Sequence, residues 1–321
     1  MTRFSAIVPV FNRPEEVDEL LRSMTGQILK FDEVIIVEDG SSLTCRDVVD
    51  SYKAFLPIQY FKKPNSGQGF TRNYGFEKAT GDYLIVFDSD CILPDTYLEN
   101  VLDGINQDSL DAFGGPDKAM PGFTPIQKAI SYSMTSAFTT GGIRGKKNGI
   151  GKFHPRSFNM GISRKVFEDT GGYIITRMGE DIEFSIRIIE KGFKVGLIED
   201  AYVFHKRRTS FWQFFKQLRF FGRARINVGR YFPGEIKLIH TLPALFLIGL
   251  IIWLTTPLYF NEMFVFGLWS NVAFAMLLFI DASRETKSLA VGFLSVIASY
   301  IQLIAYGTGF LSEGIIKLIK G

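Results

Sequence analysis

The sequence predicts an α/β domain with a mainly parallel central sheet, followed by helices that cross a membrane. Short apolar runs alternate with helical patterns through the first 200 residues, and the links between them are short. Two of the apolar runs end in acidic residues, and long runs without charge fill much of residues 238–321. Alternating strands and helices with short links are typical of a parallel sheet flanked by helices.

Each element of this pattern follows from local sequence. The first run is short, apolar and rich in β-branched residues, which predicts a buried strand. The next segment has apolar residues at helical spacing, with Asn12 as a candidate N-cap and Pro14 in the first turn. The expected strands are Phe4–Val10, Glu33–Val37, Gln59–Lys62 and Asp82–Phe87, and the helices between and around them are Arg13–Met24, Cys45–Phe55 and Gly69–Ala79.

The composition excludes several classes of protein. With 46% hydrophobic residues, 21% charged residues and 31 Phe in 321 residues, the chain is neither disordered nor of low complexity. Its two cysteines, Cys45 and Cys91, exclude a disulfide framework and a zinc site of several cysteines, and they indicate a reducing compartment. The net charge of +3 is too small to argue for a nucleic-acid partner.

The C-terminal part of the chain contains three apolar runs. From Leu238 to Ile280 the only formal charge is Glu262, and this stretch provides two runs of the about 20 residues that span a bilayer as a helix. A break at Pro257–Glu262 separates the two runs. A polar loop, Asp281–Ser288, precedes the third run, Leu289–Leu311. A large buried helical core is the alternative interpretation.

A basic segment, residues 205–237, precedes these runs. It has nine Lys or Arg against one acid, Glu235, and aromatic residues are interleaved with the charges. This composition is typical of a helix on an anionic membrane surface; a nucleic-acid-binding patch is the alternative, which the adjacent apolar runs disfavour. We therefore expect an α/β domain at 1–204, an interfacial helical segment at 205–237 and a transmembrane region of two to three helices at 238–321.

Charge distribution predicts the orientation in the membrane. The N-terminus lacks the pattern of a signal peptide, and the segment before the first run is strongly basic. We therefore expect a multi-pass protein of the cell inner membrane with its first domain in the cytoplasm. Lys317 and Lys320 would lie on the opposite side if the third run crosses, and the sequence leaves this conflict open.

Acidic residues follow two of the predicted strands. Asp88-Ser89-Asp90 follows the fourth strand, and two carboxylates at this spacing can converge on Mg²⁺ or Mn²⁺ together with substrate phosphates. Asp39 follows the second strand, where an acid can accept hydrogen bonds from a nucleobase or a ribose. The alternatives are a solvated turn and an Asp-Gly turn.

Three further segments offer candidate groups. Arg72 lies in a glycine-bearing loop that enters a helix, and it can reach a phosphate or be an ordinary surface residue. Glu180 and Asp181 open a helix, where they are either capping acids or a general base for an acceptor hydroxyl. His205 ends the strand-like run AYVFH and is either a metal ligand or the start of the basic segment.

These residues fall in five blocks of sequence. The blocks read AIVPVFNRPEEV, VIIVEDGSS, GQGFTRNYGFEKATGDYLIVFDSDCILPD, FNMGISRKVFEDTGGY and GEDIEFSIRIIEKGFKV. From residue 4 to about residue 230 the chain thus resembles an inverting family 2 glycosyltransferase. The resemblance implies the GT-A fold, a Rossmann-like domain that binds nucleotide-diphospho-sugars. It also implies metal-dependent transfer of a sugar to an acceptor hydroxyl, with inversion at the anomeric carbon.

The resemblance assigns roles to single residues. Three groups are implied: residues that bind the nucleotide sugar, residues that hold Mn²⁺ or Mg²⁺, and catalytic residues beside the acceptor. The first group is Pro9, Val10 and Asp39 at the base, Arg72 near base and phosphates, Asp88 and Ser89, and Asn159, Met160 and Gly161 beside the donor sugar. The second group is Asp88, Asp90 and His205, and the third is Asp181 as the base with Glu180 next to it.

One departure from the family predicts the type of transfer. Processive members carry a Gln-x-x-Arg-Trp motif, whereas residues 217–223 read QLRFFGR here, without that spacing or the Trp. We therefore expect transfer of one sugar to a lipid-linked or cell-surface glycan acceptor, in polysaccharide biosynthesis for the cell envelope. Asp39 favours a UDP-sugar as donor, with GDP and dTDP sugars left open.

Two other functions are compatible with parts of the pattern. A sugar-nucleotide nucleotidyltransferase would need a glycine-rich basic loop after the first strand, and PVFNRPEEV has no glycine. A catalytically silent subunit could anchor a partner to the membrane, but intact acids at positions 39, 88, 90 and 181 argue against it.

Overall fold

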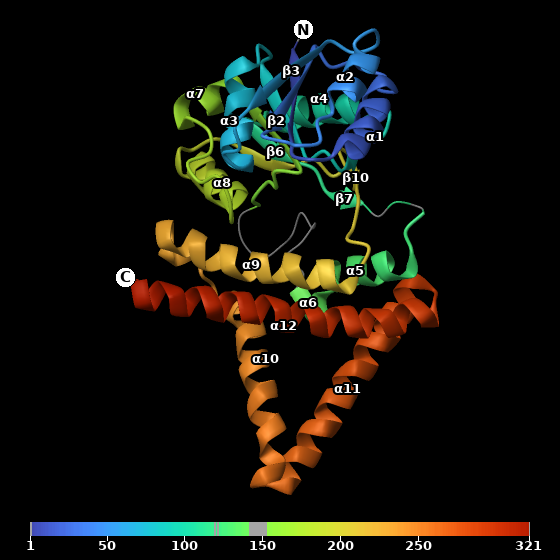
Figure 1. Ribbon diagram of the computed structural model, residues 1–321, viewed down its shortest axis with the longest axis vertical. Helices are drawn as coiled ribbons and strands as arrows, with labels where there is room; N and C mark the ends of the chain where they lie inside the picture. The colour runs from blue at the N-terminus through green and yellow to red at the C-terminus, as the bar shows by residue number, and fades with distance from the viewer. Residues whose placement is uncertain (1, 119, 121, 141–152, 321) are drawn as a thin grey trace. The chain divides into compact units, whose positions relative to one another are not determined.

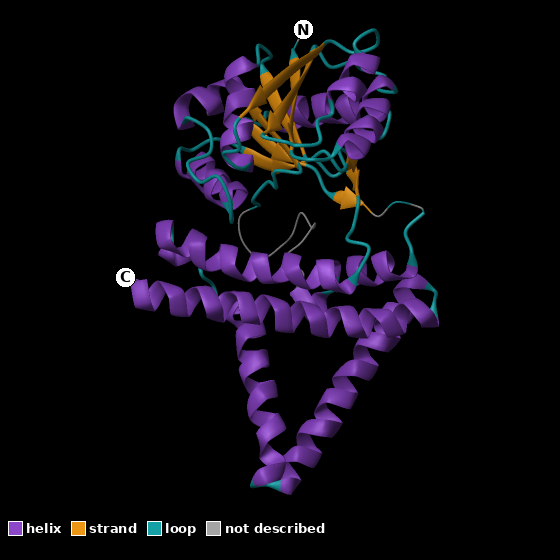
Figure 2. Cartoon of the chain, in the orientation of Figure 1, coloured by secondary structure: helices purple, strands orange, loops and turns teal. Residues whose placement is uncertain are grey.

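The computed structural model describes residues 2–118, 120, 122–140 and 153–320. These residues pack as two compact units. One holds the described residues of 1–120 and 151–206, and the other holds those of 121–150 and 207–321. Figure 2 shows that the strands lie in the first unit, whereas the regular elements described in the second are helices. The domain boundaries expected at residues 204 and 237 stay a prediction.

A seven-stranded sheet forms the centre of the first unit. Its strands are β1 (Phe4–Val10), β2 (Glu33–Asp39), β3 (Ile58–Lys63), β4 (Tyr83–Phe87), β6 (Ala112–Gly114), β8 (Asn159–Ser163) and β9 (Val195–Leu197). They lie in the order β3-β2-β1-β4-β8-β6-β9. The pairs among β1 to β4, and β6 with β9, are parallel, while β8 runs antiparallel to β4 and β6. The mainly parallel α/β sheet predicted from the sequence is confirmed.

Helices cover both faces of this sheet (Figure 1). The helices are α1 (Pro14–Thr25), α2 (Arg46–Tyr52), α3 (Gln68–Lys78), α4 (Tyr97–Asp108), α7 (Arg164–Thr170) and α8 (Glu180–Glu190). Successive strand residues point to opposite faces. Ile36 and Phe87 therefore join a core with residues of α1, α2 and α4, whereas Val37 and Val86 join a second core with residues of α3, α7 and α8.

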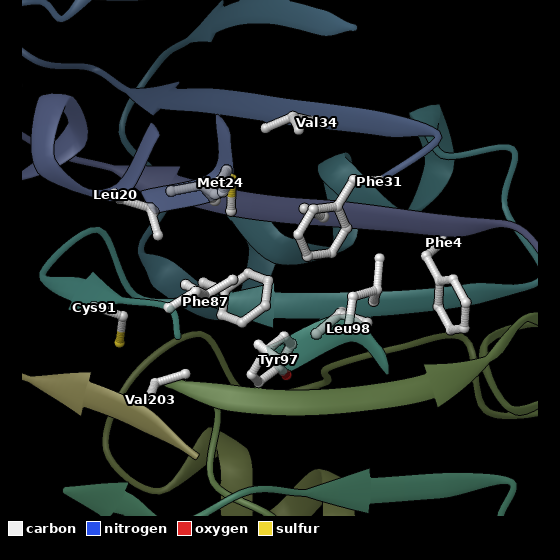
Figure 3. Close-up of a cluster of buried hydrophobic side chains, with 14 of the residues drawn as sticks. Phe4, Leu20, Met24, Phe31, Val34, Phe87, Cys91, Tyr97, Leu98 and Val203 are labelled. Atoms are coloured by element: carbon white, nitrogen blue, oxygen red, sulfur yellow. The ribbon is translucent and has the colours of Figure 1, made fainter. Parts of the chain in front are cut away.

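The first core extends to the end of β4 and holds a small second sheet in place. Figure 3 shows Phe87 of β4 between Phe31 and Tyr97, with ring centroids 6.0 Å and 5.3 Å apart, and Cys91 and Val203 in the same cluster. The second sheet consists of β5 (Cys91–Ile92), β10 (Val203–His205) and β7 (Asp117–Lys118), in the order β5-β10-β7. The chain just after β4 is thereby paired with a strand more than 100 residues later.

The second unit contains six helices within the described part of the chain. They are α5 (Pro125–Thr135), α6 (Ala137–Thr140), α9 (Phe211–Tyr231), α10 (Leu238–Thr255), α11 (Asn261–Thr286) and α12 (Leu289–Lys320), with short 3₁₀ turns at Pro233–Glu235 and Thr256–Leu258. Three segments are long and apolar enough to cross a membrane: Leu238–Leu258, Asn261–Thr286 and Leu289–Ile319. The three apolar runs predicted from the sequence are therefore helical.

Three local predictions are wrong. Asn12 does not cap α1. Its backbone is left-handed, with a φ of +55°, and its Oδ1 accepts hydrogen bonds from the N–H groups of Ser42 and Leu43, both at 2.9 Å. The second helix ends at Tyr52, where the N–H of residue 55 bonds to the carbonyl three residues back and tightens the chain into a turn. The predicted polar loop 281–288 is mostly the last part of α11, which ends at Thr286 and is followed by Lys287 with a left-handed φ of +53°.

Candidate active site

The carboxyl ends of three parallel strands lie side by side. β1 is paired on one side with β2 and on the other with β4, and all three run in the same direction. Their last residues or the residues that follow are Val10, Asp39 and Asp88. Because ligands of open α/β sheets bind at this edge, the three predicted positions are brought to the place where a site is expected.

The guanidinium of Arg72 connects two of the predicted acids. Arg72 lies in the first turns of α3 with only 2% of its surface exposed. One terminal nitrogen donates to Asp88 Oδ1 at 2.9 Å, and the other donates to Glu180 Oε1 at 3.0 Å. The carboxylate after β4 and the carboxylate at the start of α8 therefore share a single buried cation, although they are far apart in the chain.

Burial makes this arrangement electrostatically demanding. Burial alone lowers the pKa of Arg72, but the nearby Tyr173, Asp88 and Glu180 outweigh it and raise the pKa. Burial, together with the charge of Asp181, raises the pKa of Glu180, and Arg72 opposes that rise. Arg72 also lies 5.6 Å from the centre of the Tyr173 ring, and its Nε has no hydrogen-bond partner among the described residues. A buried cation with two carboxylates is stable only while all three groups remain.

Asp90 is the second acid after β4, and its oxygens have different partners. Arg13 donates to its Oδ2 at 2.7 Å, and His205 Nε2 lies 3.1 Å from its Oδ1. Burial acts to raise the pKa of Asp90, but His205 and Arg13 together hold that pKa well below its usual range. His205 reaches Asp90 because residue 205 of β10 pairs with residue 91 of β5 in an antiparallel register.

These groups offer a set of ligands for a divalent cation. Asp90, Cys91 and His205 each present one ligand atom, and the three atoms lie within 4.8 Å of one another. Cys91 fits poorly, since burial raises the pKa of its thiol well above the ordinary value and a metal binds the thiolate. A carboxylate and an imidazole remain, whereas the Asp88 carboxylate is not part of this group and binds Arg72. This donor set fits Mn²⁺ or Mg²⁺ better than a soft metal.

The carboxylate of Asp39 is held by its own loop. Its Oδ1 accepts from Lys63 Nζ at 2.7 Å and from the N–H of Ser66 at 2.8 Å, and its Oδ2 accepts from the N–H of Gly67 at 2.9 Å. Burial acts to raise the pKa of Asp39, and the Lys63 ammonium with these donors lowers it overall. Asp39 thus fixes the loop that leads into α3, next to the end of β1, where the predicted base-pocket residues Pro9 and Val10 lie.

Asp181 lies in the first turn of α8, beside Glu180. Its Oδ2 accepts from Arg156 at 3.3 Å, and its side chain keeps 17% of its surface exposed, whereas that of Glu180 keeps 4%. Gln68 of α3 donates to the same Glu180 oxygen that binds Arg72. Of the two acids, Asp181 is thus the one whose carboxylate remains accessible to solvent.

The predicted residues of β8 are buried. Tyr97 donates to Asn159 Oδ1 at 2.5 Å, and Asn159 Nδ2 donates to the carbonyl of residue 201 at 2.8 Å. Met160 belongs to the second core, and a side chain at Gly161 would collide with the ring of Phe113. Ser89 is buried as well. The contacts of these four predicted residues with a donor sugar stay a prediction.

Several contacts of the site were missed in the sequence. Arg13 binds Asp90, Arg156 binds Asp181, and Gln68 binds Glu180. A signal existed for Arg13, since it follows β1 closely and therefore lies at the same sheet edge as the acids after β4. Arg156 precedes β8 in a segment without a periodic pattern, and nothing in the sequence connects it to Asp181.

Relatives of known sequence point to one family. Glycosyl transferase family 2 matches residues 5–171. An uncharacterized glycosyltransferase of Rickettsia bellii is 34% identical over 101 residues, which are 32% of this chain and 14% of that protein. The probable glycosyltransferase YdaM of Bacillus subtilis is 24% identical over 308 residues, 92% of this chain and 70% of its own. The chain thus spans about a seventh of some curated relatives and most of others.

Solved structures show the same fold. Mannosyltransferase PcManGT from Pyrobaculum calidifontis, in complex with GDP-Man and Mn²⁺, has a TM-score of 0.60 and 16% identity, covering 97% of this chain and 87% of its own. Residues 1–349 of Staphylococcus aureus TarS have a TM-score of 0.51 and 20% identity, covering 70% of this chain and 66% of theirs. The fold is GT-A, and because the family match covers more than half of the residues, the chain belongs to glycosyl transferase family 2.

Proposed function

We propose that this protein is a membrane-attached glycosyltransferase that moves one sugar from a nucleotide-sugar donor to an acceptor hydroxyl, with inversion. The proposal depends mainly on one observation: the Arg72 guanidinium binds both Asp88 and Glu180. It connects Asp88, one of the two predicted metal-binding acids, to the predicted base helix. The family membership favours this function over a sugar-nucleotide nucleotidyltransferase.

The donor would lie at the carboxyl edge of β1, β2 and β4. Asp39, with Pro9 and Val10, would contact the nucleotide base, and Asp88, Asp90 and His205 would hold the cation. A bound Mn²⁺ or Mg²⁺ would neutralise the charge that grows on the leaving diphosphate. PcManGT binds GDP-Man with Mn²⁺, and TarS residues 1–349 bind UDP-GlcNAc, so the fold accepts both nucleotides. The position of Asp39 favours UDP in our proposal.

Asp181 would act as the general base. Its carboxylate takes the proton of the acceptor hydroxyl while the hydroxyl oxygen forms a bond to the anomeric carbon. The bond from that carbon to the diphosphate oxygen breaks, and its electron pair leaves with the diphosphate, so the configuration inverts. Arg156 orients Asp181, and Arg72 with Gln68 holds Glu180 beside it on the acceptor side.

The acceptor would be lipid-linked or a glycan precursor at a membrane surface. α10 and α11 are apolar helices, and only 6% of the residues in the most apolar 18-residue stretch of each are buried. Apolar surface of this extent requires a nonpolar environment. We propose that α10 and α11 cross the cell inner membrane and that the residues before α9 lie in the cytoplasm, where nucleotide sugars are made.

Transfer assays with matched variants test the proposal. The full chain in lipid is given a panel of nucleotide sugars, a lipid extract and Mn²⁺, and the products are identified by mass spectrometry. We expect one added sugar, and at least about 100-fold slower transfer in Asp90→Ala and Asp181→Asn. Asp103→Asn, at an exposed acid on α4, is the control and keeps full activity. Folded D90A and D181N proteins with unchanged activity would refute the assignment, and polymer formation would refute single transfer.

A further inference from the structure

α12 differs from the other two apolar helices in how much of it is covered by protein. In its most apolar stretch of 18 residues, 44% of the residues are buried, compared with 6% in the corresponding stretches of α10 and α11. Its 32 residues would measure about 48 Å at 1.5 Å per residue, longer than the roughly 30 Å of hydrocarbon that a span must cross. Length and hydropathy therefore do not determine whether α12 crosses the membrane.

α12 lies side by side with α9, the basic aromatic helix (Figure 1). Two glycines bring the backbones together: a Cβ at Gly309 would collide with the Arg219 carbonyl oxygen, and one at Gly222 would collide with the Tyr306 carbonyl oxygen. Small residues permit this close helix packing, and any larger side chain at these positions would separate the helices. α12 thus has a fixed place along α9.

An ion-pair cluster fixes the C-terminal part of α12 to α9. Glu313 is 5% exposed, and its two oxygens bind Arg223 and Arg230, each at 3.0 Å. The two arginines keep about 40% of their side-chain surface exposed, so their guanidinium groups can contact water. Charges in the hydrocarbon are costly, so a helix as basic as α9 lies at the membrane surface. α12 is paired with it.

The N-terminal half of α12 is attached to α5. Val291, Ala298 and Ala305 of α12 share a core with Ala129 and Ile130 of α5, and with residues of α9. The protein contacts of α12 therefore begin in its first turn and continue to the Glu313 cluster near its other end. A helix that crossed the bilayer beside α9 would carry that basic helix into the hydrocarbon with it.

α10 contacts α12 near its own N-terminal end, whereas α11 contacts α12 from Asn271 onward. Gly307 of α12 approaches the carbonyl oxygen of Pro243, in the second turn of α10. Tyr300 of α12 packs in one cluster with Phe274 and Leu278, in the C-terminal half of α11. Beyond those contacts, Figure 1 shows α10 and α11 extending away from α12 as a hairpin.

The exposed side chains described in α12 lie at its two ends, and all of them except Lys317 are apolar. Phe293, Ile315, Leu318 and Ile319 are 62%, 56%, 86% and 78% exposed. α12 therefore presents a surface on which α9 and α5 pack, and a second surface suited to acyl chains. That distribution is typical of a helix lying in the membrane interface.

We infer that α12 lies in the plane of the membrane surface together with α9 and α5, and that it does not cross the bilayer. The occupant of its exposed apolar side is the acyl-chain region of the leaflet on the side of α9. This inference rests on the proposed crossing of α10 and α11. It places Lys317 and Lys320 on the same side as the basic segment, which agrees with the positive-inside rule.

Cysteine labelling from each side of the membrane tests the inference. Cys45 and Cys91 are both buried, so the wild-type protein is the unlabelled control for a membrane-impermeant maleimide. Tyr259→Cys reports the turn between α10 and α11, Arg284→Cys reports the end of α11, and Lys317→Cys reports the end of α12; all three positions are exposed. The variants are labelled in intact cells and in inside-out vesicles.

We expect K317C and R284C to react from one side and Y259C from the other. If K317C reacts from the side of Y259C, α12 crosses the membrane and the inference fails, while the hairpin stands. If K317C reacts from neither side, residue 317 lies within the hydrocarbon, and the inference also fails. If Y259C and R284C react from the same side, the hairpin does not cross, and the proposed membrane attachment fails with the inference.

Discussion

Replacing Arg72 with glutamine removes the cation that two acids of the site share. Glu180 is 3% exposed and would keep Gln68 as its side-chain partner among the described residues. The Asp88 side chain is 35% exposed, so water can replace the lost guanidinium there. The two acids are therefore affected unequally: Glu180 becomes a buried charge without its cation, whereas Asp88 becomes an ordinary solvated acid.

The expected loss of stability follows from this difference. Removing one partner of a buried ion pair costs about 3–5 kcal/mol, and Gln68 places Glu180 at the lower end, about 3 kcal/mol. Asp88 adds little, because solvent screens exposed pairs. For a unit of this size a loss of about 3 kcal/mol lowers the melting temperature by roughly 6–12 °C.

The loss depends on pH in a defined direction. The pKa of Glu180 is already raised above its ordinary value of 4.5, with burial as the largest cause, and loss of Arg72 raises it further. The folded state of Arg72→Gln then binds a proton that the unfolded state has released, so its stability falls as pH rises above about 4.5. The difference from the wild type is therefore smaller at pH 5 than at pH 7.5.

Thermal unfolding of R72Q at these two pH values is the assay, with E180Q and the double variant completing a double-mutant cycle. The double variant should recover most of the loss, since a neutral amide at position 180 needs no cation. Arg22→Gln breaks an exposed pair with Asp18 on α1 and serves as the control with an unchanged melting temperature. A double variant as unstable as R72Q, or a loss independent of pH, would refute the electrostatic explanation.

Two further predictions concern other contacts. Arg156→Gln should lower kcat about tenfold and leave the donor KM unchanged, because it frees the Asp181 carboxylate without touching the nucleotide site; steady-state kinetics measure this, and a changed donor KM with normal kcat would contradict it. Glu313→Gln should lower stability by about 1–2 kcal/mol in lipid and leave kcat intact, because it weakens only the bonds to Arg223 and Arg230. The control is Glu262→Gln at the exposed turn of the hairpin, and equal melting temperatures of the two variants would contradict the prediction.

The central sheet was predictable because its strands carry their signal locally. β1, β2 and β4 each contain at least four consecutive apolar residues, as strands covered on both faces do. β6, β9 and β10 have three residues each, too few for a periodic pattern. The antiparallel strand β8 was recognised as a motif of the site and not as part of the sheet, because its place between β4 and β6 depends on pairing across distant segments.

The acids of the site were predictable as residue types at strand ends, but their partners were not. Asp88 and Asp90 are two residues apart, yet Asp88 binds Arg72 and Asp90 binds Arg13 and His205. The chain turns between them, with the N–H of residue 91 bound to the Asp88 carbonyl at 3.1 Å, so the two carboxylates face different neighbours. The partner of each then depends on which helix or strand the fold brings to that side. Sequence motifs contain no such information.

α12 shows where a sequence signal existed beyond hydropathy. Its buried positions include Val291, Ser295, Ala298, Gln302, Ala305, Gly309 and Glu313. They recur at intervals of three and four residues, so they form one stripe along the helix. The stripe contains small and polar residues, including an acid, within a run that is otherwise apolar. Of its polar members, Glu313 binds Arg223 and Arg230 of α9, and Gln302 Nε2 donates to the carbonyl of Thr139 in α6. Ser295 Oγ and Gln302 Oε1 have no hydrogen-bond partner among the described residues. The small and polar residues of this stripe predict that protein packs against it, and α9, α5 and α6 do so. Hydropathy averaged around the helix hides the stripe, because the other positions of α12 are mostly apolar.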